Sequence, residues 1–233
     1  MKKAELLKQI HRESVRIDLH VHTSFGSACA ELHNPDTLPE AMEKQNLSGV
    51  VITEHNTLWP RDMIRKLNRR LPPNRRIYSG VEVSTSRCHV VVIGLDQPLE
   101  IYSGMTPELL CSVATHNLAV AILVHPYQTS NGFDPDKERL PGFHGMEVAS
   151  TMTRGDLRIK TLILCKNSNT VPVAGSDAHC SENLGKAFTC FPHLPADEKE
   201  LALMIRQGLG VPMTREGASV NDSENNGDSL IVC

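Results

Sequence analysis

Two histidines one residue apart, His20 and His22, close a short apolar segment with the sequence VRIDLHVHT (residues 15–23). In an extended backbone, residues i and i+2 project from the same face, so both imidazoles can reach one metal ion. A single pair of this kind is weak evidence in a chain with 11 histidines. The evidence is stronger here because later segments that we predict to be strands also end in metal-binding residue types, namely His55, Glu82, His125, Asp177 and His179.

These residues follow apolar or β-branched runs that alternate with helix-like segments. We predict strands over residues 15–23, 48–53, 76–84, 89–95, 119–124, 145–148, 170–175 and 187–191. We predict helices over residues 2–13, from 37 onward, and over 60–71, 106–117, 154–166 and 195–209. The third and fourth strands are too close in sequence for a parallel crossover, so they should form an antiparallel hairpin that brings His89 beside Glu82. The alternation favours a parallel sheet, and about seven such units predict a closed α/β barrel with its chemistry at the C-terminal strand ends.

The composition is typical of one soluble globular domain. A formal net charge of −3 argues against a general attraction to nucleic acid or membranes. The seven cysteines are scattered without CxxC spacing, a pattern typical of reduced thiols. No segment is apolar enough for a membrane span, and residues 1–10 lack the core of a signal peptide, so we expect a cytoplasmic protein. We expect residues 1–213 to form the domain and residues 214–233, which include the polar run GASVNDSENNGD, to form a disordered tail.

The candidate site is rich in nitrogen and oxygen ligands and lacks a thiolate pattern. Such ligands suit Zn²⁺, Mn²⁺ or Fe²⁺. Their number exceeds the needs of one tetrahedral ion. The sequence therefore predicts at least two ions, with Glu82 and Asp177 as the natural bridging carboxylates. Two ions about 3.5–4 Å apart can clamp a phosphoryl group and generate hydroxide between them.

Six short motifs occur in order along the chain: DLHVHTS (18–24), ITEHN (52–56), GVEVS (80–84), HVVVIG (89–94), LVHPY (123–127) and GSDAH (175–179). In this order they resemble the PHP superfamily, named for DNA polymerases and histidinol phosphatase. The resemblance covers residues 15 to 192 and implies a distorted seven-stranded (β/α) barrel, two or three divalent ions at its mouth, and phosphoester hydrolysis. It implies metal-ligand roles for His20, His22, His55, Glu82, His89, His125, Asp177 and His179.

Two positions depart from the PHP pattern. The family usually has Asp or His five or six residues after the second histidine of HxH, where this chain has Ser27 and Ala28. Nearby substitutes would be Cys29, Glu31 or His33. The usual Asp of the TDH motif is replaced by Glu54, which keeps the carboxylate on a longer side chain. These departures favour a two-metal site over a three-metal site.

The resulting hypothesis is a metal-dependent phosphoesterase that hydrolyses phosphomonoesters or small nucleotides through a metal-bridged hydroxide. Glu54 would fix a ligand histidine, and Glu147 is either an orienting group or an ordinary carboxylate. Arg154 either binds the substrate phosphate through two N–H groups or only opens the helix that follows it.

Two other functions stay open. The first is an exonuclease acting on short RNA or DNA ends, for which the basic residues 65–76 would track the backbone. A solvated helix face is the favoured interpretation of that run, because no aromatic residue for base stacking is interleaved. The second is a metal-binding accessory module with reduced catalysis, which the vacant position at Ser27 and Ala28 keeps open. Barrel hydrolases of C–N bonds also begin with HxH but usually carry a bridging lysine on a strand, and no predicted strand here ends in lysine.

Overall fold

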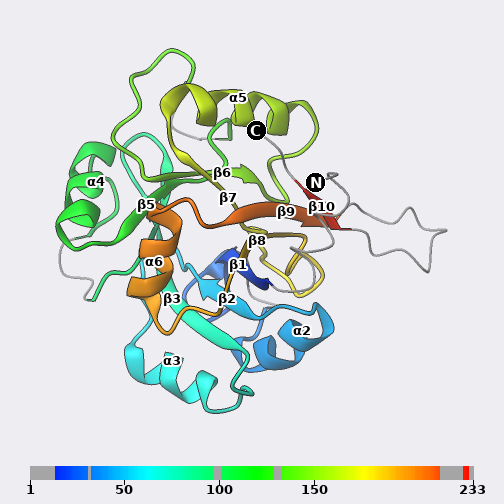
Figure 1. The fold of residues 1–233 in the computed structure, drawn as a ribbon. Coiled ribbons are helices and arrows are strands. Elements are labelled where there is room, and N and C mark those ends of the chain that lie inside the picture. Colours follow the sequence, from blue (N-terminus) through cyan, green and yellow to red (C-terminus); the bar gives the residue numbers. More distant parts are fainter. Residues whose placement is uncertain (1–13, 31–32, 97–100, 129–132, 216–227, 231–233) are drawn as a thin grey trace.

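The computed structural model describes residues 14–30, 33–96, 101–128, 133–215 and 228–230. Their strands form one sheet in the order β10-β9-β8-β1-β2-β3-β4-β5-β6-β7. The helices lie around this curved sheet (Figure 1). The strands are β1 (Val15–Val21), β2 (Gly49–Ile52), β3 (Arg76–Ser84), β4 (His89–Ile93), β5 (Val120–Leu123), β6 (Gly145–Ala149), β7 (Val171–Ala174), β8 (Ala187–Phe191), β9 (Val211–Arg215) and β10 (Asp228–Leu230). The helices are α2 (Leu38–Lys44), α3 (Arg61–Asn68), α4 (Pro107–His116), α5 (Asp156–Ser168) and α6 (Glu198–Arg206), with short 3-10 turns at Ala28–Ala30 and Pro35–Thr37.

The chain that follows β7 returns to β1 and makes the sheet nearly closed. The backbone N–H of Asp177 donates to the carbonyl oxygen of His20 at 2.8 Å. The backbone N–H of His22 donates to the carbonyl oxygen of Ala178 at 2.9 Å. The fold is therefore a mixed α/β fold with a barrel-like sheet, which agrees with the predicted class.

The predicted count of seven strands is wrong, because the sheet contains ten in the described part of the chain. Strand β8, which is predicted over residues 187–191, pairs antiparallel with β1. The strands that are not predicted, β9 and β10, extend the sheet antiparallel from β8. The sequence pattern does not predict β9, because Pro212 has no backbone N–H and proline is disfavoured in strands. The predicted domain boundary at residue 213 falls inside β9, and residues 228–230 of the predicted tail form β10. Residues 216–227 and 231–233 of that tail, and the helix predicted over 2–13, lie outside the described residues.

The central strands are buried on both faces. All residues of β2 and β6 are buried, which explains the continuous apolar run of β2. Strands β3 and β4 pair antiparallel, with Ser84 opposite His89, as their short connection predicts. One cluster of buried side chains joins β1, β3, β4, β5 and β7 to α6. Among the described helices, none combines the length and the apolar character needed to cross a membrane.

Candidate metal centre

The carboxylate of Glu82, near the end of β3, lies among imidazoles from several elements. Its Oε2 atom is 3.2 Å from His22 Nε2 and 3.0 Å from His55 Nδ1. Its Oε1 atom is 2.9 Å from His89 Nδ1 and 3.1 Å from His125 Nε2. The predicted hairpin is the reason that His89 reaches this carboxylate, since the start of β4 lies beside the end of β3.

Asp177 adds a second carboxylate to the same cluster. Its Oδ1 atom is 3.4 Å from Nε2 of both His20 and His22. These two Nε2 atoms lie 3.1 Å apart. His20 Nε2 also lies 3.5 Å from Glu82 Oε2, so five imidazoles surround the Glu82 carboxylate.

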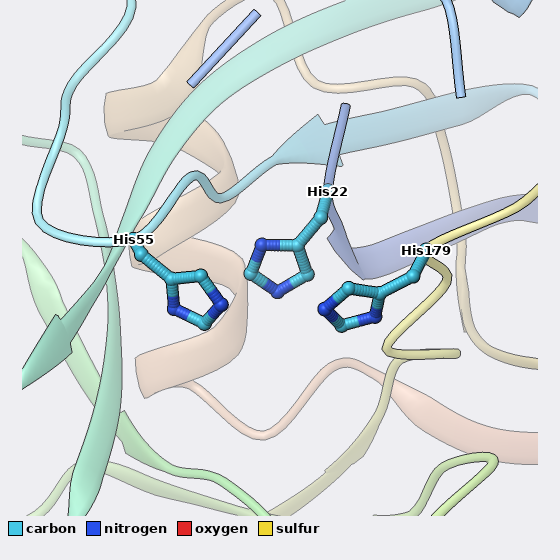
Figure 2. A group of neighbouring side chains, drawn as sticks. All are labelled: His22, His55 and His179. Atoms are coloured by element: carbon cyan, nitrogen blue, oxygen red, sulfur yellow. The ribbon is translucent and has the colours of Figure 1, made fainter. Parts of the chain in front are cut away.

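The imidazole of His22 lies between those of His55 and His179 (Figure 2). The ring centroids are 4.4 Å apart in both pairs. The three residues follow β1, β2 and β7, which end at the same side of the curved sheet. The structure thus brings all eight predicted ligand residues into one cluster.

The backbone is strained at two positions of the cluster. The φ angle is 31° at His125 and 55° at Asp177, a region that residues other than glycine rarely adopt. Backbone hydrogen bonds hold both positions: His125 N donates to Glu147 Oε2 at 3.2 Å, and Asp177 N donates to the His20 carbonyl oxygen at 2.8 Å. Strain of this kind is typical of functional sites, where the surrounding structure enforces it.

Hydrogen bonds at Nδ1 orient two of the imidazoles. His20 Nδ1 lies 2.9 Å from Glu147 Oε1, and His179 Nδ1 lies 3.0 Å from the carbonyl oxygen of Asp177. Because an ionised carboxylate and a carbonyl only accept, both Nδ1 atoms carry a proton. When these imidazoles are neutral, their Nε2 atoms present lone pairs, which is the usual arrangement of a metal-ligating histidine.

Buried charges in the cluster shift one another's pKa. Burial would raise the pKa of Glu82, but the imidazoles, His20 foremost, hold it well below its usual range. Burial opposes the charged form of His20, yet the carboxylates of Asp177, Glu147 and Glu82 raise its pKa well above the ordinary value. Protons on the imidazoles therefore balance the carboxylates, and a divalent cation can replace those protons.

Two buried atoms of the cluster have no hydrogen-bond partner among the described residues, Glu82 Oε2 and His125 Nδ1. The three imidazole nitrogens within 3.5 Å of Glu82 Oε2 are not in hydrogen-bond geometry. Buried polar atoms are nearly always paired, so an unpaired carboxylate oxygen among imidazoles fits a cation ligand. Three overlapping groups have ligand atoms within 4.8 Å of one another: His22, His55 and His179; His20, His22 and Glu82; Glu82, His89 and His125.

Comparisons with known proteins agree with this fold. A family model described as PHP-associated matches residues 161–208. The match covers 48 of the 233 residues, so this part of the chain is similar to PHP-associated sequences. No curated protein matches the sequence significantly.

Solved structures with a similar fold share little sequence with this chain. PsfC from Pseudomonas syringae PB-5123 has a TM-score of 0.60 and 16% identity, over 82% of this chain and 88% of that one. A Bifidobacterium adolescentis protein, named as a metal-dependent phosphoesterase, has a TM-score of 0.57 and 14% identity, over 82% and 96%. The lesion-specific endonuclease PfuEndoQ from Pyrococcus furiosus has a TM-score of 0.62 and 16% identity, over 83% and 56%.

The position at which PHP proteins usually have a further ligand is occupied differently here. Ser27 is buried, and its hydroxyl lies 3.1 Å from His22 Nδ1. Cys29 is exposed, and Glu31 lies outside the described residues. His33 is buried but belongs to none of the three groups of ligand atoms in the described chain.

The two residues predicted to act on a ligand or substrate differ in their surroundings. The Glu54 side chain is fully buried and accepts hydrogen bonds from Thr23, Ser27 and Trp59. Arg154 is exposed in the loop before α5. The sequence pattern gives no indication of the bond from Trp59 Nε1 to Glu54 Oε1, 3.0 Å long, because a buried tryptophan in a loop looks like an ordinary core residue.

Proposed function

We propose that this protein is a PHP-type metal-dependent phosphoesterase that hydrolyses phosphomonoesters or small nucleotides. The observation that carries the proposal is the buried Glu82 carboxylate within 3.5 Å of five imidazoles, beside the second carboxylate of Asp177. The name of the Bifidobacterium protein, which has the same fold, supports this class of reaction.

We propose that two divalent ions, Zn²⁺, Mn²⁺ or Fe²⁺, would be held by the carboxylates of Glu82 and Asp177 together with the imidazoles around them. His20, His22 and Asp177 lie on the Oε2 side of Glu82, and His89 and His125 on its Oε1 side. His55 and His179 flank His22 and would join His20, His22 and Asp177 as ligands.

A third ion would lack a carboxylate of its own. The carboxylates of Glu82 and Asp177 already contact the imidazoles that would bind the first two ions. Ser27 stands near the usual position of the further ligand, and its hydroxyl is hydrogen-bonded to Glu54. Two ions are therefore favoured over three.

When bound, such cations supply positive charge for the phosphoryl oxygens and activate water. The chain's own residues orient the ligands and the substrate. The Glu147 carboxylate accepts hydrogen bonds from His20 Nδ1–H and from the backbone N–H of His125. Glu54 is proposed to act on a ligand histidine without touching the substrate. The exposed guanidinium of Arg154 is proposed to bind the substrate phosphate through two parallel hydrogen bonds.

The proposal is tested on protein stripped by a chelator and reloaded with Mn²⁺ or Zn²⁺. We expect two ions per chain by elemental analysis, and hydrolysis of p-nitrophenyl phosphate that depends on the metal. His20→Ala and Asp177→Ala should lose both metal and activity. His116→Ala, which removes an exposed imidazole on α4, is the matched control and should retain both. Full activity of either site variant would exclude this centre.

A nuclease is the second candidate, because the similar fold of PfuEndoQ belongs to an endonuclease. It predicts that a short oligonucleotide is degraded faster than a mononucleotide, with steep inhibition by salt. The basic segment gives this candidate little support. Arg65, Arg70 and Arg75 form ion pairs with acidic side chains, which reduces the charge available to a phosphate backbone.

An accessory module that binds metal without catalysis is the third candidate. It predicts two bound ions and no turnover across a broad panel of phosphate esters and oligonucleotides. That outcome would leave the metal centre intact and exclude the phosphoesterase.

A further inference from the structure

Ser27 occupies a buried position between a carboxylate and an imidazole of the metal centre. Its side chain is almost fully buried, with 2% exposed. Its Oγ atom lies 2.5 Å from Glu54 Oε2 and 3.1 Å from His22 Nδ1. The hydroxyl thus connects Glu54 to His22.

The chemistry of the three groups sets the direction of these hydrogen bonds. An ionised carboxylate only accepts, so the single hydroxyl proton of Ser27 goes to Glu54. The Ser27 oxygen then accepts from His22 Nδ1–H and, at 3.3 Å, from the backbone N–H of His55. With its proton on Nδ1, a neutral His22 presents the Nε2 lone pair to the cluster, 3.2 Å from Glu82 Oε2.

Glu54 is held in place from its other sides. The Thr23 hydroxyl donates to Oε1, and the Thr23 backbone N–H donates to Oε2 at 3.2 Å. Trp59 Nε1 donates to Oε1 at 3.0 Å. Gly26 permits this packing, because a Cβ there would lie only 2.8 Å from Glu54 Cγ. The carboxylate is therefore a fixed anchor for the Ser27 hydroxyl.

We propose that Ser27 is a positioning residue that couples the Glu54 carboxylate to His22 and so fixes this imidazole for metal binding. The inference rests on the proposed function, because it takes His22 as a metal ligand. Near the point where a further PHP ligand is expected, this chain has a hydroxyl that orients an existing ligand. Partners of this kind typically change metal affinity by about 10- to 100-fold.

The test compares Ser27→Ala with Thr23→Val by calorimetric titration of the metal-free full chain with Zn²⁺. Both variants remove one hydroxyl that donates to Glu54, but only Ser27→Ala also removes the acceptor of His22 Nδ1–H. We expect Ser27→Ala to bind Zn²⁺ about 10- to 100-fold more weakly with an unchanged number of ions. Thr23→Val should weaken Zn²⁺ binding less than Ser27→Ala does, because the Thr23 backbone N–H and Trp59 Nε1 still hold Glu54.

A double-mutant cycle with Glu54→Gln tests whether the carboxylate acts through Ser27. Glu54→Gln keeps the shape of the side chain and removes its charge. If the two residues act in series, the Ser27→Ala/Glu54→Gln protein should bind Zn²⁺ no more weakly than Ser27→Ala alone. If the losses of Zn²⁺ affinity in the two single variants add in the double variant, the proposed coupling is contradicted.

A spectroscopic readout separates positioning from a general structural role. In Co²⁺-loaded protein, the Nδ1–H proton of a bound His22 should give a hyperfine-shifted NMR signal that exchanges slowly with water. We expect this proton to exchange faster in Ser27→Ala and to be unchanged in Thr23→Val. A structural role would instead lower the thermal midpoint of both metal-free variants and leave the exchange rate unaltered.

The outcomes distinguish this inference from the proposed function. A wild-type chain that binds no Zn²⁺ would refute the metal centre itself. A wild-type chain that binds Zn²⁺ as tightly as Ser27→Ala does would refute only the role of Ser27. Loss of one ion in Ser27→Ala would make Ser27 a ligand and would equally overturn the positioning role.

Discussion

A methyl group on Gly175 would lie 2.6 Å from Cβ of His20 and 2.7 Å from its backbone nitrogen. The chain after β7 therefore passes against β1 at a distance that only glycine permits. Two residues later, Asp177 donates its backbone N–H to the carbonyl oxygen of His20. This close approach places the Asp177 carboxylate beside His20 and His22.

Gly175→Ala should separate β7 from β1 and disturb the metal centre. The added Cβ meets backbone atoms, which cannot rotate away, so we expect a loss of about 1–3 kcal/mol in the free energy of unfolding. Urea denaturation of the metal-free protein measures this loss, and Zn²⁺ titration should show weaker binding. Gly142→Ala is the control, because a Cβ there would meet no atom within 4 Å. Equal stability of the two variants would show that the contact is easily relieved.

Glu82→Gln should abolish metal binding and also destabilise the metal-free protein. The buried carboxylate balances imidazoles whose pKa values are raised by their acidic neighbours. Removing one partner of a buried charge pair costs about 3–5 kcal/mol, because the remaining charge is left uncompensated. Chemical denaturation and elemental analysis give the two readouts. Glu40→Gln, on the exposed face of α2, is the matched control. Retention of two ions by Glu82→Gln would exclude a bridging role.

Glu147→Gln should weaken metal binding without changing the number of ions. Both carboxylate oxygens of Glu147 are used, one by His20 Nδ1 and the other by the backbone N–H of His125. A glutamine offers one acceptor in place of two, so one of these contacts is lost. We expect the affinity for Zn²⁺ to fall about 10- to 100-fold. An unchanged affinity in calorimetric titration would make Glu147 an ordinary buried carboxylate.

Local patterns in the sequence predict much of this structure. The β-branched runs predict β2, β3 and β4, and the short connection predicts the antiparallel hairpin that brings His89 to Glu82. Contacts between distant segments are not visible in such patterns. Gly175 and Ser27 look like ordinary loop residues, and their importance depends on the positions of His20 and Glu54 after folding.

The strands beyond β8 were not predictable for a related reason. The segment VPMTR is short and contains a proline, so its local preference for a strand is low. Its neighbours in the sheet, β8 and β10, supply the backbone partners that make it a strand. Tertiary pairing thus overrides local propensity at this edge.

His144, which is not one of the predicted metal ligands, should make stability depend on pH. Its Nδ1 atom accepts from the backbone N–H of Ala121 at 3.0 Å, which requires a neutral ring, and its Nε2 lies 3.1 Å from the Thr115 hydroxyl. Burial, together with the positive charge of Arg206, lowers the pKa of His144 from 6.5 to about 4. The unfolded chain therefore takes up a proton more readily than the native protein between these two values. The stability contributed by neutral His144 is present above pH 6.5 and is lost progressively as the pH falls toward 4.

His144→Asn tests this dependence, because the asparagine Oδ1 can accept from Ala121 N but does not titrate in this range. Urea unfolding of the metal-free proteins at several pH values between 4 and 7 gives the measurement. All other titrating groups are common to both proteins, so their contributions cancel in the difference. We expect the wild type to lose more stability than His144→Asn as the pH falls. Parallel stability curves over this range would assign the acid sensitivity of the fold to other residues.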